Sequence, residues 1–338
     1  MKKKDILVFV GLFLVMGLLS CNRINPQHEV KINGLAQGTY YAITYFDHET
    51  RNLQPEIDSF FKAFDKSASV YLESSIISLV NNNDPSVILD DSFTMVFNKS
   101  QEVSAATNGA FDITTMPLTN AWGFGFTDPM KLDSTHVDSL LQFVDYRMVK
   151  LADGKFIKQK PEITIDYNAI AQGYSADLIG KILEDKGINN YLIDVGGEVL
   201  GKGMKPDGSF WKVGIEKPTT GADDPRSLDA IVNLQDKALA SSGNYRRFFI
   251  KDGVKFSHTI DPKTGYPITH TLLSVSVLAD DCMTADAYAT AFMVMGVEKA
   301  KAFIGSHSAL EAHFIFTNSD GKYETWTSPG LDKLIVKN

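Results

Sequence analysis

The order of strand-like and helix-like segments constrains the fold of this chain more than any other feature. Short runs rich in β-branched and aromatic residues are mixed with segments of helical apolar spacing, without the regular alternation that builds a parallel sheet. The spacing predicts helices over 91–106, 169–186, 283–295 and 297–305 and from Ser134 onward. It predicts strands over 38–46, 191–195, 211–216, 229–234, 254–260, 272–279, 311–317 and 322–327. This pattern favours an α+β fold with a largely antiparallel sheet and packed helices.

Helix boundaries and domain limits have their own signals. Asn108-Gly109 follows the apolar pattern of 91–106 and is expected to end that helix. Ser134 is expected to cap the helix that follows it. No shift in composition marks a linker, so a single compact domain over 31–338 is expected.

The N-terminal segment has the features of an export signal. Three lysines at 2–4 precede an uninterrupted apolar run over 6–19, and Ser20 then stands directly before Cys21. The run is too short to cross a bilayer, which takes about 20 apolar residues. Because the small residue and the cysteine resemble a bacterial lipobox, residues 1–20 are expected to be a cleaved signal peptide and Cys21 the lipidated N-terminus. An ordinary signal peptide with an incidental cysteine is the less favoured alternative.

These features predict where the protein resides and what it does not bind. Residues 21–30 are polar and aperiodic and are expected to form a lipidated tether. The domain is then expected on the exported, periplasmic or extracytoplasmic side of a membrane, anchored as a lipoprotein. Removal of the signal takes away three lysines and one aspartate from a chain whose formal charge is already -8. An acidic protein has no broad attraction for nucleic acid, so no nucleic-acid partner is expected.

The glycine-rich run 196–203 argues against two common nucleotide-binding motifs. It has the spacing of a P-loop up to Lys202, but Gly203 stands where that motif needs Ser or Thr to reach magnesium. No G-x-G-x-x-G fingerprint of dinucleotide-binding folds occurs in the chain. Gly196-Gly197 is expected either as a tight turn between strands or as a place where the backbone closely approaches a ligand.

The segment 284–290 carries the best candidate for a metal site. Asp286 and Thr290 are four residues apart on an expected helix, so they present a carboxylate and a hydroxyl on one face. Both are hard oxygen donors, and magnesium is usually held by one or two carboxylates together with water and substrate phosphate. An ordinary half-buried helix explains the same residues, and the spacing alone does not decide between the two.

His258 and Cys282 are two side chains with catalytic potential. His258 is expected at the end of a strand, before a turn over 261–264, where it can act as a general base because its ordinary pKa is near neutral. A histidine with only a structural role in the strand is the alternative. Cys282 lies in an acidic context, which raises a thiol pKa and opposes nucleophilic use, so a structural role is expected.

Two further clusters combine polar and aromatic residues. Ala110-Phe111-Asp112 follows the turn at Asn108-Gly109, and its aromatic ring can either flank a planar ligand or enter the core. Asp166 precedes the helix expected over 169–186, and Gln172 lies in its first turns. Each cluster is a weak signal on its own.

Segments along nearly the whole expected mature chain carry a family resemblance. They are Gly34–Tyr40, Ser69–Ser78, Asn108–Thr114, Asp166–Tyr174, Asp194–Glu198, Ser241–Tyr245, His258–Gly265 and Ala285–Thr290. In this order they resemble the ApbE family, whose members are FAD:protein FMN transferases. The resemblance implies a single ApbE-like, T-fold-like flavin transferase domain over 31–338.

The resemblance also implies roles for individual residues. Asp286 and Thr290 would bind Mg²⁺ together with the backbone carbonyl of Ala169, and His258 would be the catalytic base. This chain departs from the family at Gln37, where the family usually has Met, and at Gln172, where it often has Lys or Glu. The residues implied to line the FAD site are Gln37, Tyr71, Ala110, Phe111, Asp112, Asp166, Gln172 and Ile260.

The implied reaction is a magnesium-dependent transfer of FMN from FAD to a threonine or serine hydroxyl of an acceptor redox protein, with release of AMP. Positioning and charge neutralisation do most of the catalysis in displacements at phosphorus. Two alternatives stay open at this point: an FAD pyrophosphatase that gives FMN and AMP, and a non-enzymatic flavin-binding lipoprotein.

Overall fold

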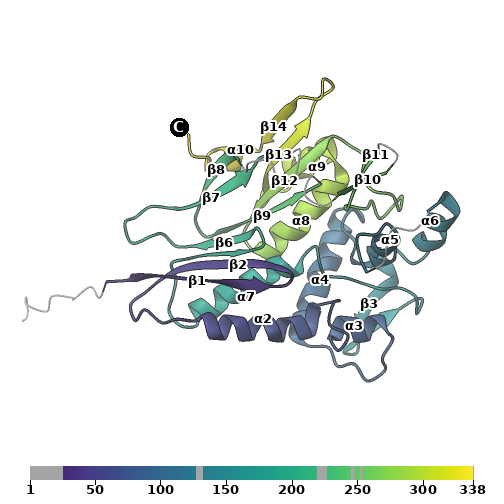
Figure 1. Cartoon of the computed structure of the whole chain (residues 1–338), viewed down its shortest axis with the longest axis horizontal. Helices are drawn as coiled ribbons and strands as arrows, with labels where there is room; N and C mark the ends of the chain where they lie inside the picture. The colour runs from purple at the N-terminus through teal and green to yellow at the C-terminus, as the bar shows by residue number, and fades with distance from the viewer. Residues whose placement is uncertain (1–25, 127–131, 219–226, 245–247, 252–253, 338) are drawn as a thin grey trace, which may run out of the picture.

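An eight-stranded antiparallel sheet with helices packed on one face forms the frame of the molecule (Figure 1). The computed structural model describes residues 26–126, 132–218, 227–244, 248–251 and 254–337. It confirms the α+β class, because every strand pair in the sheet is antiparallel. From edge to edge the strands are β1 (His28–Ala36), β2 (Thr39–Asp47), β5 (Tyr191–Val195), β6 (Glu198–Lys202), β9 (Lys237–Gly243), β12 (Leu272–Ala279), β13 (Glu311–Thr317) and β14 (Tyr323–Thr327).

Four helices enclose the main core against the inner face of the sheet. They are α2 (Gln54–Ala68), α4 (Asp91–Ala106), α7 (Ala171–Glu184) and α8 (Cys282–Met295). α8 contacts β9 and β12 on one side and α7 on the other, so most of its residues are buried. A polar residue on α8 therefore needs a specific reason to be there, because burial of an unpaired polar group is costly.

A hairpin covers part of the outer face of the sheet. Its strands are β7 (Trp211–Glu216) and β8 (Leu228–Leu234), which pair with each other. Trp211 and Val232 from this hairpin pack against Leu239 and Leu278 of the sheet in a second core. Where the hairpin lies, the central strands are therefore buried on both faces, by the main core on the inner face and by this second core on the outer face.

Shorter elements complete the fold. They are α3 (Ile76–Asn81), η1 (Ile113–Thr115), α5 (Met116–Ala121), α6 (Ser134–Leu141), η2 (Tyr146–Met148), β3 (Val149–Ala152), β4 (Lys155–Lys158), β10 (Phe248–Lys251), β11 (Val254–Ser257), α9 (Val297–Gly305) and α10 (Pro329–Asp332). A small apolar cluster around Leu118, Val137 and Ile260 holds α5 and α6 to the chain before α8.

Most predicted elements are confirmed, with small differences at their ends. α4 has the predicted bounds, and Asn108 and Gly109 that follow it both have positive φ, as an end signal requires. The predicted cap of α6 is wrong by one residue. The side chain of Asp133 accepts a hydrogen bond from the backbone N–H of His136 at 2.9 Å, and Ser134 is the first helical residue.

The predicted tether is shorter than expected. His28, Glu29 and Val30 belong to β1, because their backbone pairing with β2 continues back to the pair His28 and Asp47. The predicted signal peptide and Cys21 lie outside the described residues. In the part of the chain that the structure describes, no helix is both long and apolar enough to span a membrane.

Candidate functional site

A cavity of about 770 Å³ opens at one end of the sheet. It lies where the β1–β2 turn, the end of α2, the first turn of α7 and the β5–β6 turn meet. Three residues predicted for the flavin site line it together: Gln37, Tyr71 and Gln172. These residues are far apart in sequence, so the fold itself brings them to one place. We call this hollow the site cavity.

Local geometry fixes the side chains at the edge of the site cavity. Gln37 has φ of 51° in the β1–β2 turn, a conformation that only a tight turn imposes on such a residue. Its Oε1 accepts a hydrogen bond of 3.2 Å from the Ser175 hydroxyl of α7, which holds the turn against that helix. Tyr71 is 66% exposed, and its ring lies 5.0 Å from that of Phe126. Tyr71 therefore stands at the mouth of the cavity rather than in its interior.

The β5–β6 turn forms one wall of the site cavity. Gly196 and Gly197 have φ of 70° and 112°. They form a tight turn between the two strands, which was one of the two alternatives expected for this segment. A Cβ on Gly196 would lie 2.7 Å from Cγ2 of Thr39 and 3.3 Å from Nε2 of Gln172. The glycine is thus required both by its conformation and by close packing beside the cavity.

The first turn of α7 also meets the predicted metal ligand Asp286 on α8. The backbone N–H of Gly173 donates a 3.1 Å hydrogen bond to Oδ2 of Asp286. The two helices approach closely here, since a Cβ on Gly173 would lie 2.4 Å from the carbonyl oxygen of Cys282. Burial raises the pKa of the Asp286 carboxyl to about 7, and the Gly173 N–H opposes that shift. Gln172 lines the site cavity, so Asp286 lies directly behind the cavity wall.

The two other predicted magnesium ligands, Thr290 and the carbonyl of Ala169, lie on α8 and just before α7. Thr290 lies one turn further along α8 and is half-buried, while Ala169 is in the segment that leads into α7. Within the described residues, no three side chains of His, Cys, Asp or Glu gather as a metal cluster. One carboxylate, one hydroxyl and one carbonyl leave several positions for water and a diphosphate, which is the usual manner in which proteins bind magnesium.

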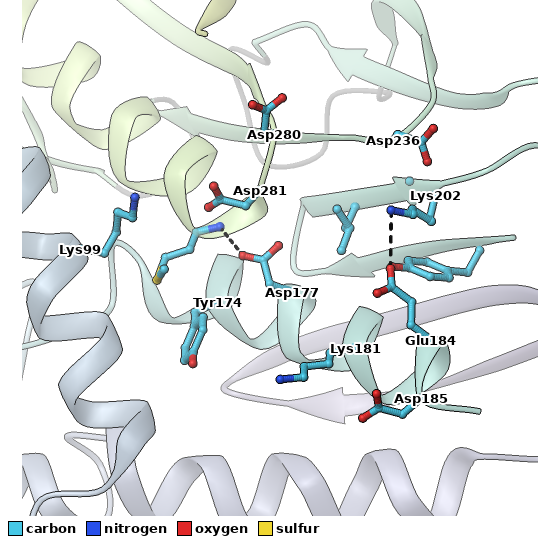
Figure 2. A pocket seen from close by; sticks show the side chains of 14 residues that line it. Lys99, Tyr174, Asp177, Lys181, Glu184, Asp185, Lys202, Asp236, Asp280 and Asp281 are labelled. Carbon is cyan, nitrogen blue, oxygen red and sulfur yellow. Dashed lines mark hydrogen bonds and ion pairs between the residues drawn. The ribbon is translucent and has the colours of Figure 1, made fainter. Parts of the chain in front are cut away.

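A second carboxylate, the half-buried Asp177, lies one turn further along α7 and also meets the first turn of α8. Asp177 of α7 accepts hydrogen bonds from the backbone N–H groups of Cys282 at 2.8 Å and Met283 at 2.9 Å. Figure 2 shows Asp177 pointing from α7 towards the first turn of α8, with a hydrogen bond drawn as a dashed line. Burial raises the pKa of Asp177 to about 7, the same direction as at Asp286. Cys282 is fully buried and its pKa is raised, mainly by burial, which agrees with a structural role.

A short aromatic segment connects two predicted site residues. In 122–126 the ring of Phe124 lies 6.3 Å from the ring of His258, and Phe126 packs on Tyr71. His258 follows β11 directly, as predicted, and is half-buried. Because alternate aromatic residues of one segment contact both side chains, His258 and Tyr71 are held on the same side of the molecule by this segment.

The remaining predicted flavin residues gather around η1. Asp166 donates its backbone N–H to the carbonyl of Ile113 at 3.0 Å, which joins the segment before α7 to the segment of Asp112. Burial raises the pKa of Asp112 and of Asp166 to about 6. Asp112 lines a separate hollow of about 310 Å³. Ala110 and Ile260 are buried. Phe111 is 2% exposed and belongs to the main core, so its ring enters the core, which was one of the two expected alternatives.

Comparison with known proteins agrees with this arrangement. The model of the family described as "ApbE family" matches residues 37–314. This chain belongs to the ApbE family. It is 34% identical to an FAD:protein FMN transferase of Vibrio cholerae over 97% of this chain and 98% of the relative, and 31% identical to one of Escherichia coli K12 over 90% and 89%.

Solved structures of the ApbE family have the same fold. The flavin transferase ApbE from Vibrio cholerae has a TM-score of 0.81 at 32% identity, and the match covers 91% of this chain and 100% of that one. The apo form of the flavinyl transferase ApbE from Pseudomonas stutzeri has a TM-score of 0.81 at 29% identity, with 91% and 97% covered. The whole described domain is therefore built as an ApbE domain.

The sequence interpretation missed other residues that line the site cavity. Asp65 and Ser69 come from α2 and its end, and Asn168 comes from the segment before α7. Burial raises the pKa of Asp65 above its ordinary value. The helical spacing of Ile57, Phe61 and Phe64 would have revealed α2, but no residue pattern marks Asp65 or Asn168 as site residues.

Proposed function

We propose that this chain, an enzyme of the FAD:protein FMN transferase class, uses magnesium to move FMN from FAD onto a threonine or serine hydroxyl of an acceptor redox protein and releases AMP. One observation supports this most strongly. The site cavity and the buried Asp286 carboxylate lie on two sides of the first turn of α7. A diphosphate bound there would meet the positive end of a helix and hard oxygen donors at the same point.

The residues of the chain have distinct roles in this proposal. Gln37 and Tyr71 position the flavin end of FAD, and Gln172, in the first turn of α7, lies at the phosphate end; all three line the site cavity. The acceptor hydroxyl oxygen forms a bond to the FMN-side phosphorus, and the bond from that phosphorus to the AMP oxygen breaks. His258 takes the hydroxyl proton, a step worth about 10²–10⁴-fold in general acid–base catalysis.

Magnesium, held by Asp286, Thr290 and the carbonyl of Ala169, would neutralise charge on the diphosphate when bound. The burial-raised pKa of Asp286 is consistent with a carboxyl that becomes ionised when a cation arrives, because a nearby positive charge favours the charged form. The proposal that these three groups hold magnesium rests on the chemistry of their donor atoms. Each of the three groups offers an oxygen, which is the atom that magnesium prefers.

The proposed location follows from the N-terminus. We propose that residues 1–20 are a signal peptide and that Cys21 carries a lipid, so that the domain is anchored on the exported side of a membrane. β1 begins at His28, so few residues separate Cys21 from the sheet. Acceptors would then be redox proteins that face the same side of that membrane.

A product assay tests the reaction. The purified full chain is incubated with FAD, magnesium and candidate acceptor proteins, and AMP release and flavin-fluorescent bands on a denaturing gel are measured. The expected result is AMP together with a labelled band, and loss of both when a chelator removes magnesium. AMP and FMN without a labelled band would indicate the pyrophosphatase, and FAD binding without products would indicate a binding protein.

A further inference from the structure

A second hollow meets the site cavity from the other face of the sheet. It has a volume of about 480 Å³, lies between the outer face of the sheet and β7, and is called the outer groove here. Thr39 and Gly196 line both the outer groove and the site cavity. Gly196 is packed so closely against Thr39 that a Cβ would not fit. The two hollows are therefore neighbours across a thin wall.

Leu192, Val199 and Leu239 line part of the outer groove, but towards the end of the sheet the floor on β9 and β12 is made of small residues. On β9 and β12 the facing pair Leu239 and Leu278 belongs to the second core beneath the hairpin. The next pair on this face, Ser241 and Ser276, lines the groove, with their hydroxyl oxygens 2.7 Å apart. Gly243 continues the floor towards the end of the sheet. The hairpin thus covers the apolar part of the face and leaves a strip where another backbone can approach closely.

The wall of the groove is the edge of a strand. Five successive residues of β7, 212–216, line the groove, whereas one face of a strand would contribute only alternate residues. The other strand of the hairpin, β8, pairs with the C-terminal segment through Val232 and Ile335. Within the described residues, β7 pairs only with β8. Such an edge is a template for an added strand.

The charges of the groove do not suit a second phosphate ligand. Among the described residues, its charged lining residues are Asp194, Glu216 and Lys212, so there negative groups outnumber positive ones. We propose that the outer groove binds an extended segment of the acceptor protein as an added strand along β7. This segment would present its threonine or serine at the wall formed by Thr39 and Gly196. The inference rests on the proposed function and names its acceptor subsite.

The test uses the full chain in detergent and a pool of dye-labelled synthetic peptides, each with one central threonine and about ten residues long, the upper length of common strands. Ser241→Phe fills the groove, because Ser241 is exposed on its floor. Ser241→Ala removes only the hydroxyl. Thr325→Phe is the matched control, since Thr325 is exposed on β14 at the far edge of the sheet.

Peptide binding by fluorescence anisotropy and FAD binding by flavin fluorescence are measured on all four proteins. Ser241→Phe should bind the pool at least about 10-fold more weakly, and the other two variants like the unchanged chain. A pool methylated on the backbone nitrogens beside the threonine should also bind about 10-fold more weakly. FAD affinity should stay the same throughout.

The inference is overturned if the unchanged chain does not bind the pool, or if Ser241→Phe or the methylated pool binds equally well. Failure of the proposed function gives a different result. In that case peptides bind as expected, but the unchanged chain transfers no FMN to any peptide or candidate acceptor protein.

Discussion

Asp177 and Asp286, two carboxylates where α7 meets the first turns of α8, are bonded in different ways. Asp177 accepts two backbone hydrogen bonds from the first residues of α8, one on each oxygen. Asp286 accepts, within the described residues, a single hydrogen bond from Gly173. Burial raises the pKa of both carboxyls to about 7. Burial and an altered pKa therefore do not distinguish a structural carboxylate from a functional one.

The difference lies in unused bonding capacity and position. Both oxygens of Asp177 are occupied as a cap, which satisfies N–H groups that a helix leaves without partners. Asp286 keeps one oxygen for another partner and stands behind the wall of the site cavity. A carboxylate accepts about four hydrogen bonds, so a single one is few for a buried group. This comparison supports a structural role for Asp177 and the proposed role of Asp286 as a magnesium ligand.

The largest expected effect comes from paired substitutions of the two carboxylates. Asp286→Asn keeps an acceptor for Gly173 but removes the charge proposed to hold magnesium, so FMN transfer and AMP release should fall by about 10²–10³-fold or more. Asp177→Asn should change activity by less than about 3-fold and lower the thermal midpoint instead, since one N–H of α8 loses its acceptor at a cost of about 1–3 kcal/mol.

Steady-state rates and thermal unfolding of both variants check this pair. The Asp177 variant serves as the control for general damage to the α7–α8 contact. If Asp286→Asn retained full turnover, or if the two variants lost activity to the same degree, the assignment of separate roles would be wrong.

A somewhat smaller effect is expected from a substitution of Gly173, which lies at the close contact between α7 and α8. In Gly173→Ala the new Cβ would meet the Cys282 carbonyl oxygen at 2.4 Å and Cβ of Asp286 at 2.8 Å, so the helices must move apart. Overpacking of this kind costs about 1–3 kcal/mol. The free energy of unfolding should fall, and magnesium-dependent turnover should fall with it.

Gly305→Ala is the matched control for that substitution. Gly305 also lies in a helix, and a Cβ there would meet nothing within 4 Å. Denaturant unfolding should show this variant at least as stable as the unchanged chain. Equal stability of Gly173→Ala would show that the close approach of α7 and α8 is not required.

Much of the fold could be predicted from the sequence, because local patterns dictate it. α4 has apolar spacing and an end signal, α8 is apolar on nearly all sides and ends at Gly296, and β5 is a short apolar strand before two glycines. Residues 28–30 of β1 were assigned to the tether because His28 and Glu29 are polar and exposed, as is common in an edge strand, and the rest of β1 was not predicted as a strand. β6 was not predicted, because it lies inside the glycine-rich run 196–203, whose spacing resembles a phosphate-binding loop more than a strand.

The site was only partly predictable, for a physical reason. Asp286 and Thr290 share one helix, so their spacing reveals them as a pair. The bond from Gly173 to Asp286 joins residues 113 positions apart, and no local pattern encodes such a contact. The same holds for Asp65, whose position in the site cavity depends on how α2 packs.

The smallest expected effect concerns pH and again separates the two carboxylates. Burial raises the folded-state pKa of Asp286 to about 7, against about 3.9 for an unfolded aspartate, so the folded protein binds more protons between these values. Its stability must therefore fall as pH rises from about 4 to about 7. With magnesium and FAD removed by chelation and dialysis, Asp286→Asn escapes this loss and should be more stable than the unchanged chain at pH 8, with little difference near pH 4. Asp177→Asn should show no such gain, because its lost hydrogen bond offsets the benefit. Urea unfolding at the two pH values measures both variants, and a gain at pH 8 that was larger for Asp177→Asn would reverse the roles given to these two residues.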